Sequence, residues 1–124
     1  MKELTKAEEQ LMQCLWLQEK AYLKDIVKHY PEPVPAYTTI STVVNVLVKK
    51  EFVGFETHGK SRLYFPLITK EKYTKQSING LINSFFDNSV KKFASFFASR
   101  EDLSVKELKE IRKLIDKQIE KRKS

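Results

Sequence analysis

The sequence has few of the residues on which most metal and catalytic chemistry depends. Its 124 residues include one cysteine, two histidines and three glycines. The single cysteine, Cys14, excludes an internal disulfide and fits a reducing compartment. The histidines, His29 and His58, fall in separate predicted elements, and no Gly-rich phosphate loop is present. We therefore expect no metal site, no cofactor and no enzymatic activity.

Long apolar runs are absent as well. The longest is CLWL at residues 14–17, which is far too short to cross a bilayer. Residues 1–6, with the sequence MKELTK, lack the apolar core of a signal peptide. We therefore expect a cytoplasmic protein with no direct membrane insertion.

The charge is mainly of one sign, but it is unevenly placed. A formal net charge of +7 favours a polyanionic partner such as nucleic acid. Residues 1–67 contain nine Lys and Arg against eight Asp and Glu, whereas residues 68–124 contain fourteen against eight. Most of the excess therefore lies in the second half, and DNA binding by the first half would depend on a few well-placed contacts.

Residues 38–49 are the most informative stretch. They are rich in β-branched side chains, which favour strands, but the helical period sorts polar from apolar residues more cleanly than alternation does. At about 100° per residue, each kind of side chain gathers on its own face. The polar face has Thr38, Thr42, Asn45 and Lys49, and the apolar face has Ile40, Val43, Val44 and Leu47. We predict a helix that presents hydrogen-bonding groups to DNA, and the alternative is a solvated surface helix.

The elements around this helix follow the order of a winged helix-turn-helix. A capping box formed by Thr5 and Glu8 predicts a helix over residues 6–18, and a second helix is expected over 22–30 before the prolines of 31–35. Residues 53–57 and 62–65 predict a hairpin. At its tip His58, Lys60 and Arg62 are placed to touch phosphate or enter a minor groove, although for His58 a solvated turn is the favoured reading.

From residue 69 onward the pattern is helical again, with Gly80 as a weak point. The last helix begins at a capping box formed by Ser104 and Glu107, and its apolar seam is too short for an isolated coiled coil. We predict dimerisation through this region, with intramolecular packing onto the first half as the alternative. The expected contact residues are Phe93, Phe97, Leu108, Ile111, Leu114, Ile115 and Ile119.

The expected fold is therefore mainly α with a small β-hairpin. We predict a winged helix-turn-helix DNA-binding domain over residues 1–68, followed by a C-terminal helical dimerisation domain over residues 69–124.

Short segments in a fixed order make the chain resemble the penicillinase-repressor family over nearly its whole length. The matching segments are LTKAE at 4–8, LW at 15–16, TISTV at 39–43, LVKK at 47–50, YFPL at 64–67 and EDLS at 101–104. The resemblance implies a dimeric winged-helix repressor on a palindromic double-stranded DNA operator. It would silence genes for β-lactam resistance or a related stress response.

The same resemblance assigns roles to individual residues. The DNA face of the third helix would consist of Thr38, Ser41, Thr42 and Asn45, and the phosphates would be positioned by Lys49, Lys60 and Arg62. In this family a membrane sensor protease cuts the repressor near the junction of its two parts, and the candidate cleavage site here is Phe96-Phe97.

Three departures from the family pattern accompany the matches. An Asn-Phe pair stands at the cleavage site of some members, where this chain has Phe96-Phe97. The usual Ser-Pro entry to the third helix is replaced by Ala36-Tyr37, which removes a cap. The cysteine pairs of the copper-responsive members are absent, which argues against copper sensing.

Two other functions fit the same residues. A winged-helix protein-interaction module without sequence-specific DNA binding would use an adhesive patch bordered by Tyr37, Val46 and Val48. An architectural or RNA-binding protein would use charge alone.

Overall fold

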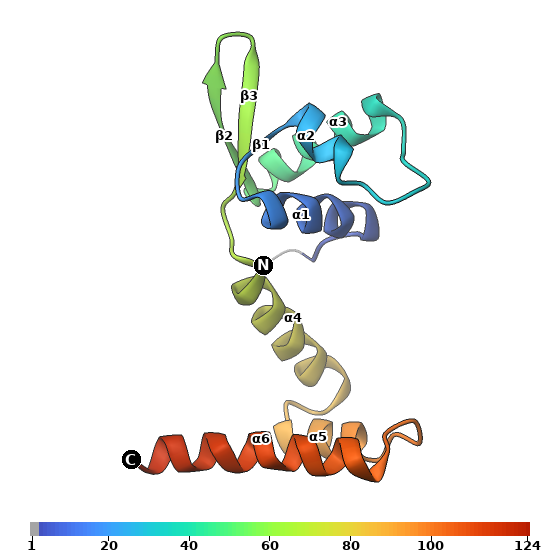
Figure 1. The fold of residues 1–124 in the computed structure, drawn as a ribbon, viewed down its shortest axis with the longest axis vertical. Coiled ribbons are helices and arrows are strands. Elements are labelled where there is room, and N and C mark those ends of the chain that lie inside the picture. The colour runs from blue at the N-terminus through green and yellow to red at the C-terminus, as the bar shows by residue number, and fades with distance from the viewer. Residues whose placement is uncertain (1–2) are drawn as a thin grey trace. The chain divides into compact units, whose positions relative to one another are not determined.

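The computed structural model describes residues 3–124 and divides them into two compact units (Figure 1). The first unit ends at Ser77, and the second comprises Ile78–Ser124. Residues 1 and 2, which belong to the segment considered above for a signal peptide, lie outside the described residues. The chain is mostly helical and contains the predicted hairpin, which an additional strand extends to a small three-stranded sheet.

Helix α1 (Lys6–Gln18) begins at the predicted capping box. The Thr5 hydroxyl accepts a hydrogen bond from the Glu8 amide at 3.2 Å, and the Glu8 carboxylate accepts one from the Thr5 amide at 2.9 Å. Both bonds satisfy amides that the helix itself leaves free. The helix then buries Leu11, Met12 and Leu15 completely, so it contributes a large part of the first unit's core.

Strand β1 (Ala21–Tyr22) and helix α2 (Leu23–Lys28) differ from the prediction of one helix over residues 22–30. The strand pairs antiparallel with the later strand β3, with Ala21 opposite Tyr64. Because a two-residue strand is too short to show alternation, the sequence pattern missed it. The pairing occupies Tyr22, so the helix begins one residue later than predicted.

Helix α3 (Tyr37–Lys49) confirms the helical prediction for the β-branched stretch. Its buried residues are Ile40, Val44 and Leu47, spaced at three and four positions, and all are at most 1% exposed. Packing of this stripe against the core therefore overrides the local preference for strand. As predicted, Ala36 provides no side-chain cap for the first turn.

The wing is the hairpin of β2 (Val53–His58) and β3 (Ser61–Pro66), each longer than predicted. The register runs from Val53 opposite Pro66 to His58 opposite Ser61. Gly59 has a φ of 62°, a left-handed conformation that glycine adopts without strain, and it makes the tight turn possible. The strand order in the sheet is β1-β3-β2.

The core of the first unit reaches into the start of helix α4 (Lys70–Phe85). The ring of Tyr73 lies 5.9 Å from that of Trp16 and 6.1 Å from that of Phe52, and its hydroxyl accepts a hydrogen bond from the Leu4 amide at 3.2 Å. The Trp16 indole donates to the Ile68 carbonyl at 2.9 Å. The first compact unit consequently extends beyond the boundary predicted at residue 68.

The second unit contains the end of α4, helix α5 (Val90–Ala98) and helix α6 (Val105–Lys123). Helix α4 continues through Gly80 without a break. Helix α6 starts at the predicted capping box, in which Ser104 and Glu107 exchange two hydrogen bonds of 3.0 Å. Of the residues from 78 to 124, all of which are described, Ile82 alone is buried.

Within residues 3–124, no helix combines the length and the apolar character that a membrane crossing requires.

Candidate nucleic-acid interface

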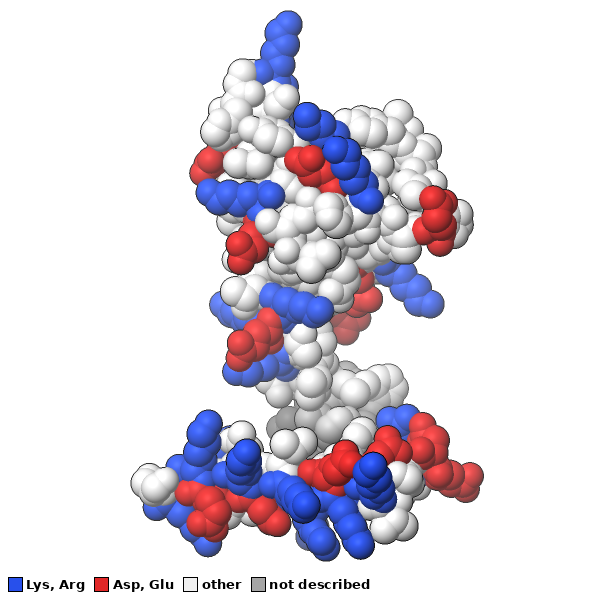
Figure 2. Space-filling model, in the orientation of Figure 1, with Lys and Arg blue, Asp and Glu red and all other residues white. Residues whose placement is uncertain are grey.

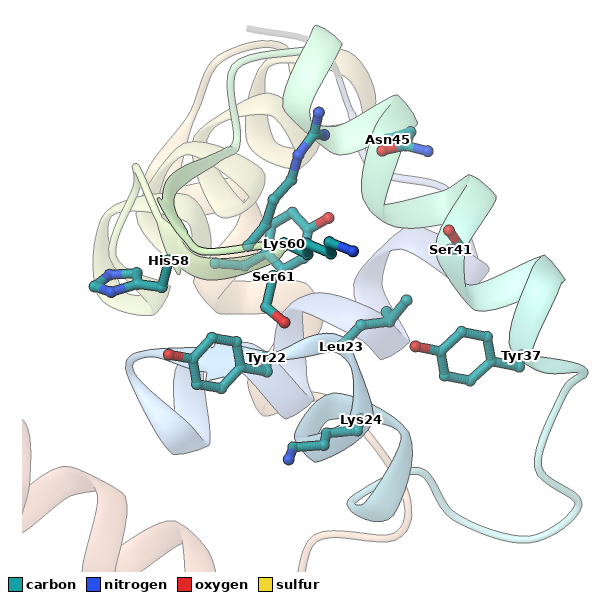
Figure 3. A pocket seen from close by; sticks show the side chains of 11 residues that line it. Tyr22, Leu23, Lys24, Tyr37, Ser41, Asn45, His58, Lys60 and Ser61 are labelled. Atoms are coloured by element: carbon teal, nitrogen blue, oxygen red, sulfur yellow. The ribbon is translucent and has the colours of Figure 1, made fainter.

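A cleft of about 530 Å³ opens between α3 and the wing in the first unit (Figure 3). Elements that are distant in sequence meet there: β1, α2, α3 and both strands of the hairpin. The lining residues are Tyr22, Leu23, Lys24, Tyr37, Ser41, Asn45, His58, Lys60, Ser61, Arg62 and Tyr64.

Helix α3 forms one wall of this cleft. Tyr37, Ser41 and Asn45 are spaced four residues apart, so they lie on one side of the helix (Figure 3). Each carries a hydroxyl or an amide, and Asn45 and Tyr37 are exposed. This wall therefore offers a row of uncharged hydrogen-bonding groups.

The opposite walls supply positive charge. Lys24 comes from α2, and Lys60 and Arg62 come from the hairpin, while the lining contains no Asp or Glu. A positively charged side chain also extends beyond the tip of the hairpin (Figure 2). The first half of the chain is nearly neutral overall, yet Lys and Arg are the residues that bring charge to its cleft, and they concentrate a positive potential where an anion can enter.

Two side chains of the hairpin are held by aromatic or acidic neighbours. The Arg62 guanidinium lies 4.2 Å from the centre of the Phe55 ring, a cation–π contact that restrains it without neutralising its charge. His58 Nε2 lies 3.3 Å from a Glu56 carboxylate oxygen. His58 thus lines the cleft but already has an acidic partner, whereas within residues 3–124 Arg62 forms no ion pair.

The residues predicted to contact DNA fall into two groups. Ser41, Asn45, Lys60 and Arg62 line the cleft together. Thr38, Thr42 and Lys49 are exposed on α3 but do not line it. The Thr42 hydroxyl donates to the Thr38 carbonyl at 3.0 Å, so toward a partner it can act as an acceptor and present its methyl group.

Sequence reasoning assigned no part of the site to the segment Tyr22, Leu23 and Lys24, although all three residues line the cleft. Tyr22 is the second residue of β1, Leu23 and Lys24 begin α2, and the pairing of β1 with β3 brings this segment to the wing. No local pattern carries that information. Tyr37, which borders the adhesive patch in the alternative protein-interaction function, also lines the cleft.

The second unit carries an apolar cleft of about 770 Å³. Its lining residues are Leu81, Phe85, Phe86, Phe93, Phe96, Phe97 and Arg100. The Phe86 ring lies 5.5 Å from the rings of both Phe93 and Phe96. Even so, Phe85 and Phe96 are 75% and 64% exposed. Such a large aromatic surface is unusual on a protein that functions as a monomer.

The predicted seam of α6 is also open to solvent. Leu114, Ile115 and Ile119 are 64%, 55% and 45% exposed, and Leu108 and Ile111 are half-buried. Positive and negative side chains cover much of the rest of the helix (Figure 2). The seam is therefore an apolar stripe on an otherwise charged helix.

Phe96 and Phe97 lie inside α5, which runs from Val90 to Ala98. A protease binds its substrate as an extended strand, so this helix would have to unwind before the bond between them could be cut. The candidate cleavage site is therefore exposed in part but held in a helical conformation.

The described residues 3–124 contain no group of three or more His, Cys, Asp or Glu side chains that could hold a metal ion. The Cys14 thiol is buried and lies 3.5 Å from the His29 carbonyl. Burial raises the pKa of the Cys14 thiol, which keeps it protonated and unreactive.

Comparison with known proteins gives consistent matches. A family model described as Penicillinase repressor matches residues 4–117. The methicillin resistance regulatory protein MecI of Staphylococcus aureus (strain N315) is 24% identical over 116 residues, which cover 93% of this chain and 94% of MecI. The penicillinase repressor of Bacillus licheniformis is 20% identical over 115 residues, which cover 92% of this chain and 90% of that protein.

A solved structure shares the fold. The solution structure of the DNA binding domain of the repressor BlaI aligns with a TM-score of 0.51 and 23% identity, covering 59% of this chain and 94% of that domain. The likeness confirms a winged-helix architecture.

Proposed function

The chain belongs to the penicillinase repressor family of DNA-binding repressors, which are not enzymes, and we propose that it silences its target genes as a homodimer on a palindromic operator. The observation that carries the proposal is the basic, carboxylate-free cleft between α3 and the wing.

In this proposal α3 enters the major groove and one sugar-phosphate strand runs through the cleft. Lys24, Lys60 and Arg62 bind its phosphates, and the tip of the hairpin reaches toward the adjacent minor groove. Phosphate contacts of this kind fix the register of the protein on the duplex, and most of the affinity comes from them. Lys49, exposed in the last turn of α3, binds a further phosphate outside the cleft.

Sequence is read by the uncharged side chains of α3. Asn45 is suited to adenine, because its amide can donate to N7 and accept from the N6 amino group. Ser41 and Thr38 are short enough to reach base edges from the same helix. Thr42 acts as an acceptor or through its methyl group, since its proton is engaged by the Thr38 carbonyl.

Dimerisation occurs through the second unit. Its aromatic cleft and the α6 seam leave apolar surface exposed, and a second copy of the chain would cover it. A two-fold dimer presents two α3 helices to major-groove faces about one helical turn apart, which matches a palindromic site. We call the first unit of each chain, which ends at Ser77, a DNA-binding head. Joining two heads makes the second DNA contact intramolecular, so the affinity for DNA rises well above that of one head.

Release follows when the two heads are separated. We propose that a membrane sensor protease cuts at Phe96-Phe97 after α5 unwinds, which divides the aromatic cluster and removes the benefit of two linked contacts. The names of the relatives, a methicillin resistance regulator and a penicillinase repressor, favour genes for β-lactam resistance as the target.

The test is a salt titration of the full chain against a duplex from upstream of its own gene and a random duplex of equal length. A sequence-specific repressor binds the first at least about 10³-fold more tightly at matched salt. A winged-helix module for protein contact, or a protein that binds nucleic acid by charge alone, gives a ratio near one, and either result would contradict the proposal.

A further inference from the structure

The two lysines at the end of α3 have different surroundings, although they are adjacent in sequence. Lys49 is exposed in the last turn of the helix. Lys50 instead points at α1, where its Nζ lies 2.9 Å from each oxygen of the Glu8 carboxylate. The side chains of Lys50 and Glu8 are 23% and 7% exposed. Lys50 is therefore neutralised by a protein partner, and its charge is not available to a phosphate.

The Glu8 carboxylate is the centre of this contact. It accepts both bonds from Lys50 and a third from the Thr5 amide at 2.9 Å. Hydrogen bonds in which both partners are charged are short and directional. The carboxylate thus links the start of α1 to the end of α3 through bonds of defined direction. The apolar contacts of the core stabilise the packing of these helices but are not directional.

The pair lies at the corner where the recognition helix turns into the wing. Lys50 is the C-cap of α3, Glu51 follows with a φ of 66°, and the Phe52 amide donates to the Leu47 carbonyl at 3.0 Å. The Phe52 carbonyl then accepts from the Leu67 amide at 2.8 Å, just before β2 begins at Val53. These residues connect α3 to β2, so a change in the angle between the helix and the hairpin would have to alter the backbone here.

We propose that Glu8 and Lys50 form a positioning pair that sets the angle between α3 and the β2–β3 wing, and with it the width of the DNA-binding cleft. The inference rests on the proposed function, because it assigns the cleft to a phosphate strand. Neither residue touches DNA, and both act through the placement of α3.

A small rotation of α3 at Lys50 would displace the other end of the helix by a distance that matters for hydrogen bonding. Helix α3 has 13 residues and is therefore roughly 20 Å long. A rotation of about 10° at Lys50 would move the far end of the helix by roughly 3 Å, the full length of a hydrogen bond. Contacts from Tyr37 and Ser41 would be lost first, since they lie farthest from the corner.

The matched variants are Lys49→Met and Lys50→Met, measured on the operator duplex and on a random duplex at several salt concentrations. Lys49→Met removes a phosphate contact, so it weakens binding to both duplexes by a similar factor and lowers the salt slope by about 0.9. Lys50→Met weakens operator binding by about 10-fold or more, leaves random binding within about two-fold and leaves the salt slope unchanged. Equal losses on both duplexes, or no loss, would overturn the proposal.

A double variant separates positioning from simple destabilisation. Lys50→Met leaves the buried Glu8 carboxylate without its positive partner. Glu8→Gln combined with Lys50→Met removes both charges and keeps an acceptor for the Thr5 amide. We expect the double variant to regain thermal stability but not operator preference. Recovery of both would mean that only the stranded charge mattered. Lys50→Arg, which keeps the charged bonds, should retain the preference.

A measurement without DNA keeps the two proposals distinct. Residual dipolar couplings of the free protein report the orientation of α3 relative to the hairpin, and they should change in Lys50→Met but not in Lys49→Met. Unchanged couplings contradict the positioning role. Changed couplings in a protein that shows no operator preference would leave the role intact and overturn the proposed function.

Discussion

The two units of the molecule differ in how they bury apolar surface. The first gathers fifteen buried residues into one core, closed by the sheet and by the start of α4. The second, over residues 78–124, buries Ile82 alone and leaves Phe85, Phe96 and Leu114 largely exposed. The first unit therefore completes its core within one chain, while the second leaves an apolar surface that, in the proposed function, another copy covers.

This division matches the work assigned to each unit. A recognition surface must keep its side chains in fixed positions before DNA arrives, which a closed core provides. A dimerisation surface must remain open until the partner binds. In the proposed function, the unit with the closed core binds the operator, and the unit with the open apolar surface joins two chains.

The largest expected effect comes from placing a charge in the open unit. Ile115→Asp puts a carboxylate in the α6 seam, where burying it against a partner is costly, so the protein should sediment as a monomer. Operator affinity should fall by about 10²- to 10⁴-fold as the linked contacts are lost. Lys113→Asp, an exposed charge reversal on the same helix, is the control and should remain dimeric. A dimeric Ile115→Asp would show that α6 is not the seam.

The same substitution in each unit sharpens the comparison. Leu11 is fully buried in the first unit, so Leu11→Ala should lower its free energy of unfolding by about 3 kcal/mol. Leu114 is 64% exposed in the single chain, so Leu114→Ala should leave that value unchanged and raise the dimer dissociation constant instead. Fluorescence of Trp16, the single tryptophan, follows unfolding of the first unit, and sedimentation follows the dimer. If both variants lowered the stability measured by Trp16 fluorescence equally, the two leucines would not differ in the way that the two units predict.

Within the first unit, Asn45 should affect binding without affecting folding. Asn45→Ala removes an exposed amide from the cleft wall, so operator binding should weaken by about 1 to 3 kcal/mol and the preference for one base should relax. Binding to duplexes that differ at single positions measures both. A uniform loss on every duplex would mean that Asn45 does not read a base.

The smallest expected effect is a dependence of the first unit on pH. Burial alone would raise the pKa of Glu8, but the hydrogen bonds from Lys50 and Thr5 outweigh it and hold the pKa below its usual value. The folded state thus binds this proton less readily than the unfolded state, so Glu8 contributes stability above its unfolded pKa and loses it as the pH falls through the folded value. Unfolding followed at Trp16 should be more acid-sensitive in the native protein than in Glu8→Gln; equal acid sensitivity would contradict this role.

Much of the fold could be predicted because local signals agreed with it. The capping boxes at Thr5 and Ser104 marked two helix starts, and the period of the apolar residues in α3 identified a helix against its strand propensity. Strand β1 could not be predicted, since two residues carry no pattern and exist as a strand only through pairing with β3.

The candidate site was predicted in part for the same reason. Ser41, Asn45, Lys60 and Arg62 were placed by helical period, hairpin order and family resemblance, and they meet in the cleft. Lys24 reaches it through tertiary packing alone. The difference between Lys49 and Lys50 is likewise invisible in the sequence, because it depends on where α1 places Glu8. Overall charge was a poor guide, since the cleft concentrates basic residues within a nearly neutral half.

The central claim is that two first-unit heads read DNA together because the second units join them. A footprint of the full chain on the DNA upstream of its own gene and its neighbours tests this most directly. We predict two protected half-sites, related by two-fold symmetry and centred about one helical turn apart. A single isolated half-site, or protection that spreads evenly along the duplex, would contradict the account.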